Sequence, residues 1–246
     1  MQKQLTRSFA AALLTGSAML ALSATPAAAE ECLLDTNDNG VSDAGDTDGG
    51  ATSDDATALA CGVDAEANGV DASAVGTQAA ANGPSTTAVG GETVATGPGA
   101  SAIGWRAEAT AERAQAFGHL ATAQGERSLA VGENADAQSD NATAIGNEAI
   151  ADGADALALG DTAAANGPST SALGGESVAT GPGATAVGWR AGATAERAQA
   201  FGHLATAQGV RSLAVGENAD AQSDNSTAIG NEAIADGIDA LAIGDT

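Results

Sequence analysis

The small, apolar and polar positions of this chain repeat every 14 residues. Glycine stands at every fourteenth position from Gly62 to Gly244, and alanine always stands two residues before it and five residues after it. Side chains two positions apart share one face of a β-strand, so these alanines face the same side as the Ala, Ser or Thr two positions before each of them. The pattern predicts two short strands and two turns per unit, which form one coil of a β-solenoid with a very narrow interior.

The two turns of each predicted coil differ in how strictly they require glycine. One turn begins at the series Gly62–Gly244, which has no exception, and we call it the strict turn. The other begins seven residues later, is mostly glycine, and is called the tolerant turn. Its exceptions are Ala111, Ser139, Ala195 and Ser223. Glycine at nearly every seventh position argues against a coiled coil, and Gly69→Ala in a tolerant turn is expected to be mild.

The outward faces of the two predicted strands differ. The residue before each strict-turn glycine is apolar in every coil after Cys61, and this row is called the apolar column. Its members are Val75, Val89, Ile103, Phe117, Val131, Ile145, Leu159, Leu173, Val187, Phe201, Val215, Ile229 and Ile243. The matching position on the other strand is always polar, as at Asn68 and Gln124. At about 4.7 Å per coil the apolar column is roughly 60 Å long, which predicts a partner surface, most simply identical subunits around one axis.

These units resemble a known family. The segments "SLAVGENADAQSDNA" and "ATAIGNEAIADGADA", residues 128–142 and 142–156, resemble the head repeats of YadA-like trimeric autotransporter adhesins, and the resemblance covers residues 58–244. It implies a left-handed parallel β-roll that assembles as a homotrimer, with the apolar column at the trimer interface. The periodicity alone predicts only an all-β solenoid of two-strand coils with one apolar outer face.

The chain departs from the family after the repeats. It stops at "LAIGDT", without the heptad stalk and C-terminal β-strands that family members use for export and anchoring. A free secreted head and a truncated adhesin are both open at this point. We therefore expect an extracellular or cell-surface location, with outer-membrane attachment only if an anchor exists elsewhere, and no membrane insertion by this chain.

A longer duplication places unusual residues at matched positions. Residues 77–160 and 161–244 agree at 72 of 84 positions. All Arg, Trp and His residues after residue 29 fall in two matched clusters, and these residues are the candidate ligand-binding set. They are Trp105, Arg106, Arg113, His119, Arg127, Trp189, Arg190, Arg197, His203 and Arg211. Trp and Arg are frequent in binding hot spots. The alternative is edge packing, with internal charge pairing to Glu112 or Glu133.

The N-terminal 29 residues predict a secretory signal. Lys3 and Arg7 precede an apolar run from Phe9 to Leu22, and Ala27–Ala29 gives a cleavage site. Cleavage leaves six arginines against 32 acidic residues, a net charge of −26. Nucleic acid is excluded as a partner because phosphate binding needs clustered cations, and an anionic membrane surface is disfavoured for the same reason.

Residues 30–57 form an acidic segment with a candidate calcium loop. The stretch "DTNDNGVSDAGD" fits the D-x-[DN]-x-[DN]-G start of such a loop and resembles dockerin and thrombospondin type 3 loops. The expected ligands are Asp35, Asn37, Asn39, the Val41 carbonyl, Asp43 and Asp46. Asp replaces the usual last Glu, and a solvated acidic linker is the alternative.

Cys32 and Cys61 are the only cysteines, and they bracket this segment. In an oxidising compartment a bond between them is the default expectation. An interchain bond is the alternative, because Cys61 occupies the position of the apolar column.

No motif for catalysis is present, and the glycines lack the Lys of a phosphate-binding loop. We therefore expect a non-enzymatic exported adhesin head, residues 58–246, that binds an extracellular matrix protein or a surface glycan. The alternative is a secreted, calcium-stabilised structural solenoid without a specific receptor.

Overall fold

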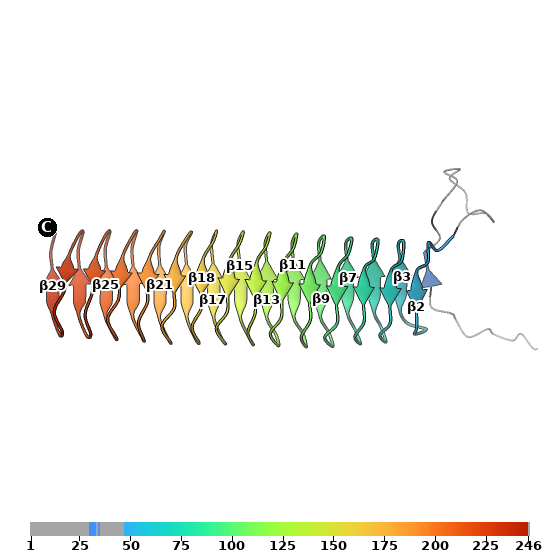
Figure 1. The fold of residues 1–246 in the computed structure, drawn as a ribbon, viewed down its shortest axis with the longest axis horizontal. Coiled ribbons are helices and arrows are strands. Elements are labelled where there is room, and N and C mark those ends of the chain that lie inside the picture. The colour runs from blue at the N-terminus through green and yellow to red at the C-terminus, as the bar shows by residue number, and fades with distance from the viewer. Residues whose placement is uncertain (1–29, 33, 35–46, 246) are drawn as a thin grey trace, which may run out of the picture.

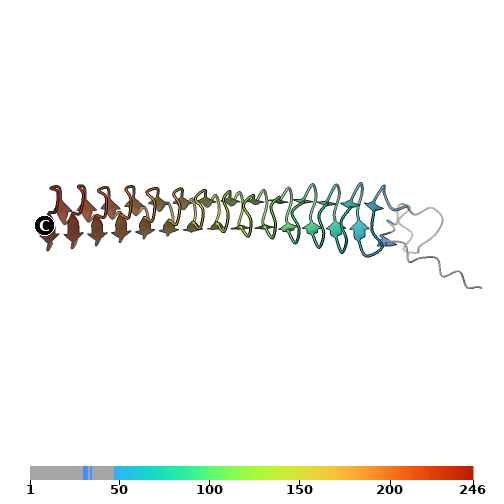
Figure 2. The same ribbon diagram turned by 90° about the horizontal axis from the view of Figure 1, so that it is seen from below.

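The chain is a stack of short coils that share two parallel sheets. The computed structural model describes residues 30–32, 34 and 47–245. Over these residues each coil adds one strand to each sheet, and the described residues contain no helix (Figures 1 and 2). The predicted all-β parallel solenoid of 14-residue coils is confirmed.

The wide sheet has 15 strands, which are the odd-numbered ones in chain order. They are β1 (Glu30–Glu31), β3 (Leu59–Cys61), β5 (Ser73–Val75), β7 (Thr87–Val89), β9 (Ser101–Ile103), β11 (Gln115–Phe117), β13 (Leu129–Val131), β15 (Thr143–Ile145), β17 (Leu157–Leu159), β19 (Ser171–Leu173), β21 (Thr185–Val187), β23 (Gln199–Phe201), β25 (Leu213–Val215), β27 (Thr227–Ile229) and β29 (Leu241–Ile243).

The narrow sheet has 14 strands, which are the even-numbered ones. They are β2 (Thr52–Ser53), β4 (Glu66–Ala67), β6 (Ala80–Ala81), β8 (Val94–Ala95), β10 (Glu108–Ala109), β12 (Thr122–Ala123), β14 (Asp136–Ala137), β16 (Ile150–Ala151), β18 (Ala164–Ala165), β20 (Val178–Ala179), β22 (Gly192–Ala193), β24 (Thr206–Ala207), β26 (Asp220–Ala221) and β28 (Ile234–Ala235).

The register between coils places each residue beside its equivalent 14 positions away. In the pair β13–β15, Ala130 lies beside Ala144, and Val131 beside Ile145. Backbone hydrogen bonds run from coil to coil, as where the Gly146 N–H donates to the Val131 carbonyl at 2.9 Å. A side chain therefore forms a column with its equivalents along the whole solenoid.

Small side chains fill the interior, as the alternation predicts. The central alanines of the wide strands, such as Ala116 and Ala144, are fully buried, and so are alanines of the narrow strands such as Ala137. The largest fully buried side chains are threonines and serines, led by Thr86, Thr93 and Thr170. Because only small side chains separate the two sheets, each coil is stabilised mainly by its backbone hydrogen bonds and by tight packing of methyl groups.

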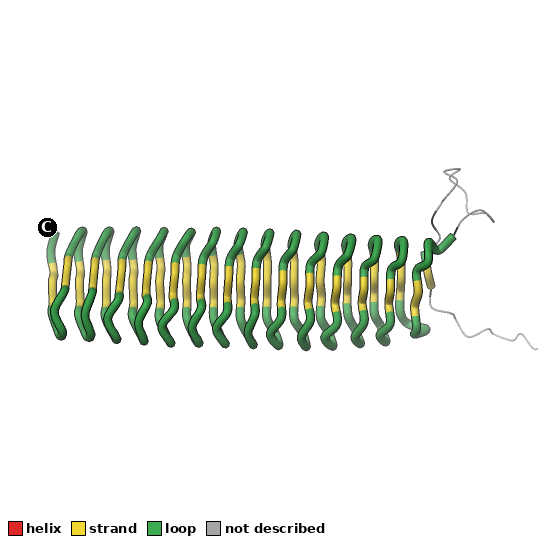
Figure 3. Tube along the Cα trace, in the orientation of Figure 1, coloured by secondary structure: helices red, strands yellow, loops and turns green. Residues whose placement is uncertain are grey.

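The turns lie along the two edges of the solenoid (Figure 3). The second residue after the glycine position has a left-handed conformation in both kinds of turn, as at Glu148 with φ 54° and Asp155 with φ 56°. The strict-turn glycines themselves have φ between 127° and 142°, a region that side chains rarely adopt.

A second restriction applies to both glycine series. A Cβ on Gly146 would overlap the carbonyl of Gly160, and a Cβ on Gly69 would overlap the backbone of Gly83 and Pro84, although φ of Gly69 is not positive. A neighbouring carbonyl must therefore move before alanine fits at Gly69. The expectation of a mild Gly69→Ala substitution is too optimistic for this reason.

Candidate functional site on the strict-turn edge

Two aromatic rings stack on the edge formed by the strict turns. Trp105 lies in the strict turn between β9 and β10, and His119 lies in the next strict turn, between β11 and β12. Their ring centroids are 5.0 Å apart, and their planes meet at 15°. The guanidinium Cζ of Arg106 lies over the Trp105 ring, 5.1 Å from its centroid. Both distances suit stacking and cation–π attraction.

Carboxylates close this stack at both ends. Arg106 Nε lies 3.3 Å from Glu92 Oε2 in the coil before, and His119 Nδ1 lies 3.2 Å from Glu133 Oε1 in the coil after. These five residues are named the strict-edge cluster. All are about half exposed, so each pair contributes little to stability. The cluster is a polar and aromatic strip across four coils.

Gly91 makes room for the indole. A Cβ at this position would lie only 3.2 Å from Trp105 Cδ1. Other coils carry side chains there, such as Thr77 and Asn147, so the turn itself accepts them. The missing side chain of Gly91 therefore leaves a slot for the indole in the coil before it, and the His119 ring stacks on the indole from the coil after it.

The second half of the duplication repeats this geometry. Trp189 and His203 stack at 5.0 Å and 13°, and Arg190 Cζ lies 5.1 Å from the Trp189 ring. Arg190 pairs with Glu176 at 3.3 Å, and His203 with Glu217 at 3.2 Å. The solenoid thus carries two copies of the cluster on the same edge, six coils apart.

The remaining candidate cations lie on the opposite edge. Arg113, in the tolerant turn between β10 and β11, lies 3.7 Å from Glu112. Arg127 and Arg211, also in tolerant turns, have no ion pair within 4.0 Å among the described residues. Each predicted cluster is therefore divided between two edges. The charge pairing expected with Glu112 and Glu133 does form.

The outer face of the wide sheet carries no charge. From β3 to β29, no outward position of these strands holds an acidic or basic residue, in a chain with 32 acidic residues. The apolar column points outward on this face and is partly exposed, most of its members less than Val75 with 36% and a few more, as at Ile103 with 42%. Both turn edges and the narrow sheet, in contrast, carry carboxylates such as Glu148, Asp155 and Asp136.

The outer face of the narrow sheet is mixed. The predicted polar column, with Asn68 and Gln124, is exposed. A second outward column, in the strands themselves, holds carboxylates such as Glu108 but also apolar residues such as Val94 and Ile150. The sequence pattern described only the first of these two columns.

The described part of the N-terminal segment is tied to the first coil. Cys32 and Cys61 form a disulfide within one chain, which is the first of the two pairings considered. β1 pairs with β3, and Leu34 forms an antiparallel bridge with Thr47. The predicted signal, residues 1–29, and the candidate calcium ligands between Asp35 and Asp46 lie outside the described residues.

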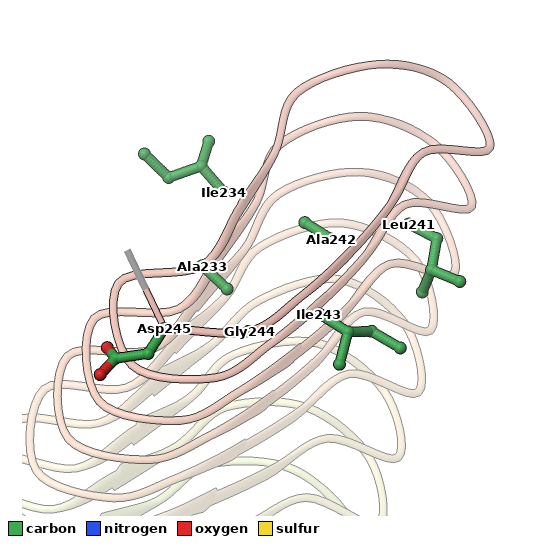
Figure 4. Close-up of a pocket in the computed structure, with 7 residues that line it drawn as sticks. All are labelled: Ala233, Ile234, Leu241, Ala242, Ile243, Gly244 and Asp245. Carbon is green, nitrogen blue, oxygen red and sulfur yellow. The ribbon is translucent and has the colours of Figure 1, made fainter.

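The hollows found on the described surface are shallow and open to solvent. One is lined by Asp64, Glu66, Gln78 and Ala80. Another lies on the last coil, and Figure 4 shows its lining. The lining residues are Ala233, Ile234, Leu241, Ala242, Ile243, Gly244 and Asp245. It contains no cluster of titratable side chains, and no group of three or more His, Cys, Asp or Glu within the described residues could hold a metal ion. Recognition on the described surface therefore has to use its faces and edges.

Comparison with known families matches these coils. The YadA head domain repeat (2 copies) matches in eight segments. They are residues 67–93, 95–121, 109–135, 123–149, 137–163, 165–191, 193–219 and 221–245. The chain belongs to the YadA head family. These repeats form adhesin-type structural heads rather than enzymes. No curated protein matches the chain. Within the described residues, no helix has the length and apolar character needed to cross a bilayer.

Several features of the site were missed in the sequence. The charge-free face could have been found by reading both outward columns of the wide strands. Gly91 and Gly175 stand one coil before Trp105 and Trp189, which indicates room for each indole. The many other glycines of the chain make this pattern hard to recognise. The left-handed residue of each turn has no sequence signature, because Asp, Gln, Arg and Leu all occupy it.

Proposed function

We propose that this protein is an exported adhesin head that assembles as a homotrimer and binds a matrix protein or a cell-surface ligand. Membership of the YadA head family supports the adhesin class and an exported, surface location. The strict-edge cluster, repeated on a rigid rod, carries the binding part of the proposal, since aromatic and Arg side chains dominate binding hot spots.

The charge-free wide face supports the assembly. A random distribution of 32 acidic residues would place some on this face, yet all outward positions from β3 to β29 avoid charge. Charged residues are depleted in the buried core of protein interfaces. Burying the exposed part of each apolar-column side chain would contribute up to about 1 kcal/mol per residue. Identical rods around one axis cover this face along its whole length.

Assembly is tested by placing charges on the apolar column. Val131→Asp with Ile145→Asp adds two buried carboxylates per interface, and we expect the trimer to dissociate. Multi-angle light scattering at several concentrations measures the mass. The matched control places Gln124→Asp and Gln138→Asp on the narrow-sheet side, where assembly should persist. A monomeric wild-type protein would contradict the trimer.

Ligand binding is tested by removing both cluster copies. Replacing Trp105, Arg106, Trp189 and Arg190 by Ala should abolish attachment to matrix-coated or cell surfaces. Arg127→Ala with Arg211→Ala, on the other edge, is the control and should attach like the wild type. Undiminished attachment of the first variant would favour the structural alternative.

The calcium loop belongs to the same proposal as a stabilising element. Asp35, Asn37, Asn39, Asp43 and Asp46 are hard oxygen ligands at calcium-loop spacing. Calorimetric titration should show one Ca²⁺ site per chain, which Asp35→Ala with Asp46→Ala removes. Absence of heat at millimolar Ca²⁺ would remove the metal from the proposal.

A further inference from the structure

We infer that the strict-edge cluster binds a neutral, extended glycan that lies parallel to the solenoid axis. This inference rests on the proposed adhesin function and names the ligand class of the same site. It follows from which faces of the indole are covered, from how the charges are paired, and from the linear arrangement of the free polar atoms.

The indole is packed on one side and still open to a ligand. His119 stacks on Trp105 from the coil after it, and the coil before it carries Gly91, which leaves room for the indole. Arg106, which pairs with Glu92 in that same earlier coil, places its guanidinium over the ring. Trp105 is nevertheless 45% exposed. It therefore acts as a platform that positions Arg106 and His119 and still offers apolar surface to a sugar beside them.

The polar atoms that remain free are both donors and acceptors. Arg106 uses Nε for Glu92, which leaves its two terminal amino groups, and His119 uses Nδ1 for Glu133, which leaves Nε2. Each carboxylate contacts its partner through one oxygen and retains the other. Within the described residues these atoms form no hydrogen bond to another protein group. Hydroxyl groups, which donate and accept at once, match such a mixture.

The charge pairing favours a neutral ligand. Arg106 pairs with Glu92, and the His119 ring bonds to Glu133, so the strip holds one arginine between two carboxylates and no cluster of cations. A polyanion would also meet the net charge of −24 of the chain, and most of that charge lies on the two edges and the narrow sheet. A basic peptide would meet the Arg106 guanidinium at the centre of the strip.

The spacing favours an extended chain. Glu92, Arg106, His119 and Glu133 stand in four consecutive coils, at about 4.7 Å per coil, which is close to the length of one sugar ring in a β-linked polymer. One cluster therefore matches about four sugars. The second cluster is six coils away, roughly 28 Å along the same edge, so one long glycan can engage both and gain avidity.

Calorimetry with soluble β-linked oligosaccharides of glucose and of N-acetylglucosamine tests the inference. The full chain should bind them at two sites, with affinity rising up to about four sugars and changing little between about 0.1 M and about 0.5 M salt. Trp105→Ala with Trp189→Ala should weaken binding about tenfold or more. Arg113→Ala with Arg197→Ala, on the opposite edge, should bind like the wild type. Glu92→Gln with Glu176→Gln keeps one acceptor oxygen at each position, and the affinity should fall only a few-fold.

Each outcome decides between ligand classes. If the wild type binds no neutral oligosaccharide at millimolar concentration but still attaches to matrix-coated surfaces, the glycan inference is wrong and the adhesin proposal stands. Binding only to sulfated glycans or to basic peptides, with steep salt dependence, overturns it as well. If oligosaccharides bind but no surface is recognised, the site is correct and the adhesin role fails. Circular dichroism verifies that each variant retains the β-structure.

Discussion

The two edges of the solenoid are built on the same seven-residue frame but obey different rules. On the strict-turn edge, glycine has a positive φ and a neighbouring carbonyl in the space of a Cβ. On the tolerant-turn edge only the second restriction applies, and Ala111 and Ser139 occupy the glycine position. Ser139 even uses its hydroxyl to donate to the Asp152 carbonyl in the next coil. A steric contact can be relieved by a local shift, whereas a φ of 127–142° remains unfavourable for any residue with a Cβ.

The same difference separates the chemistry of the edges. The strict-turn edge holds the stacked aromatic clusters, and the tolerant-turn edge holds Arg113 and Arg127 near Glu112. A backbone with invariant geometry repeats its side-chain positions from coil to coil, and stacking needs that repetition.

Gly146→Val with Gly160→Val breaks the strict edge in mid-array. Both positions have φ 142°, and a Cβ on Gly146 would overlap the Gly160 carbonyl. We expect a loss of about 3 kcal/mol or more for the pair. Because solenoid stability is nearly a sum over neighbouring coils, calorimetry should show two unfolding stages. One transition near the wild-type Tm would contradict the strict rule.

Gly153→Ala probes the tolerant edge between the same two coils. Its φ is not positive, but a Cβ would overlap the backbone of Gly167 and Pro168. We expect a loss of about 1–2 kcal/mol, typical of overpacking, with a single unfolding transition. Gly69→Ala should behave alike. If either variant is as damaging as the strict-edge pair, the two turns are equivalent and the division is wrong.

Gly91→Ala with Gly175→Ala tests whether these two glycines are needed to make room for the indoles rather than to permit a special backbone conformation. Neither residue has a positive φ, and each added methyl would press on a Trp ring. We expect less than about 1 kcal/mol of destabilisation for surface positions of this kind, together with a shift in the wavelength of tryptophan emission. Thr77→Ala is the control and should leave the emission unchanged. Unchanged emission in the glycine variants would show that Gly91 and Gly175 do not make room for the indoles.

Ser128→Ala with Ser212→Ala should stabilise the protein slightly. Both hydroxyls are buried without a hydrogen-bond partner, which costs about 1–3 kcal/mol per group. At the corresponding position, three residues after a tolerant-turn glycine, Thr86 donates to the Gly83 carbonyl at 2.6 Å. Thr86→Ala should therefore lower the Tm, while the serine variants raise it. A lower Tm for the serine variants would show that their hydroxyls do find a partner.

The periodic part of the fold was predictable from the sequence, because the small and apolar residues that specify it repeat every 14 positions. Ala at the positions of Ala130 and Ala144 in every coil specifies the interior, and Val131 and Ile145 specify one outer column. Trp105 and His119 each follow a strict-turn glycine in consecutive coils, which is enough to place them on one edge, one coil apart. The separation of Arg113 from Arg106 was not recognised from their proximity in sequence. Seven residues carry the chain from one edge to the other, so the two arginines lie on opposite edges.

The direction of the hydrogen bonds has a mechanical consequence. Bonds such as Gly146 N–H to the Val131 carbonyl run along the rod, so tension along its axis loads them one coil after another. Each coil that opens releases 14 residues, which extend to roughly 46–50 Å in place of about 4.7 Å. Under tension the rod therefore lengthens in steps, one coil at a time, and each opening of a coil dissipates mechanical work. The Cys32–Cys61 bond sets the limit at one end, because residues between the two cysteines cannot be drawn out.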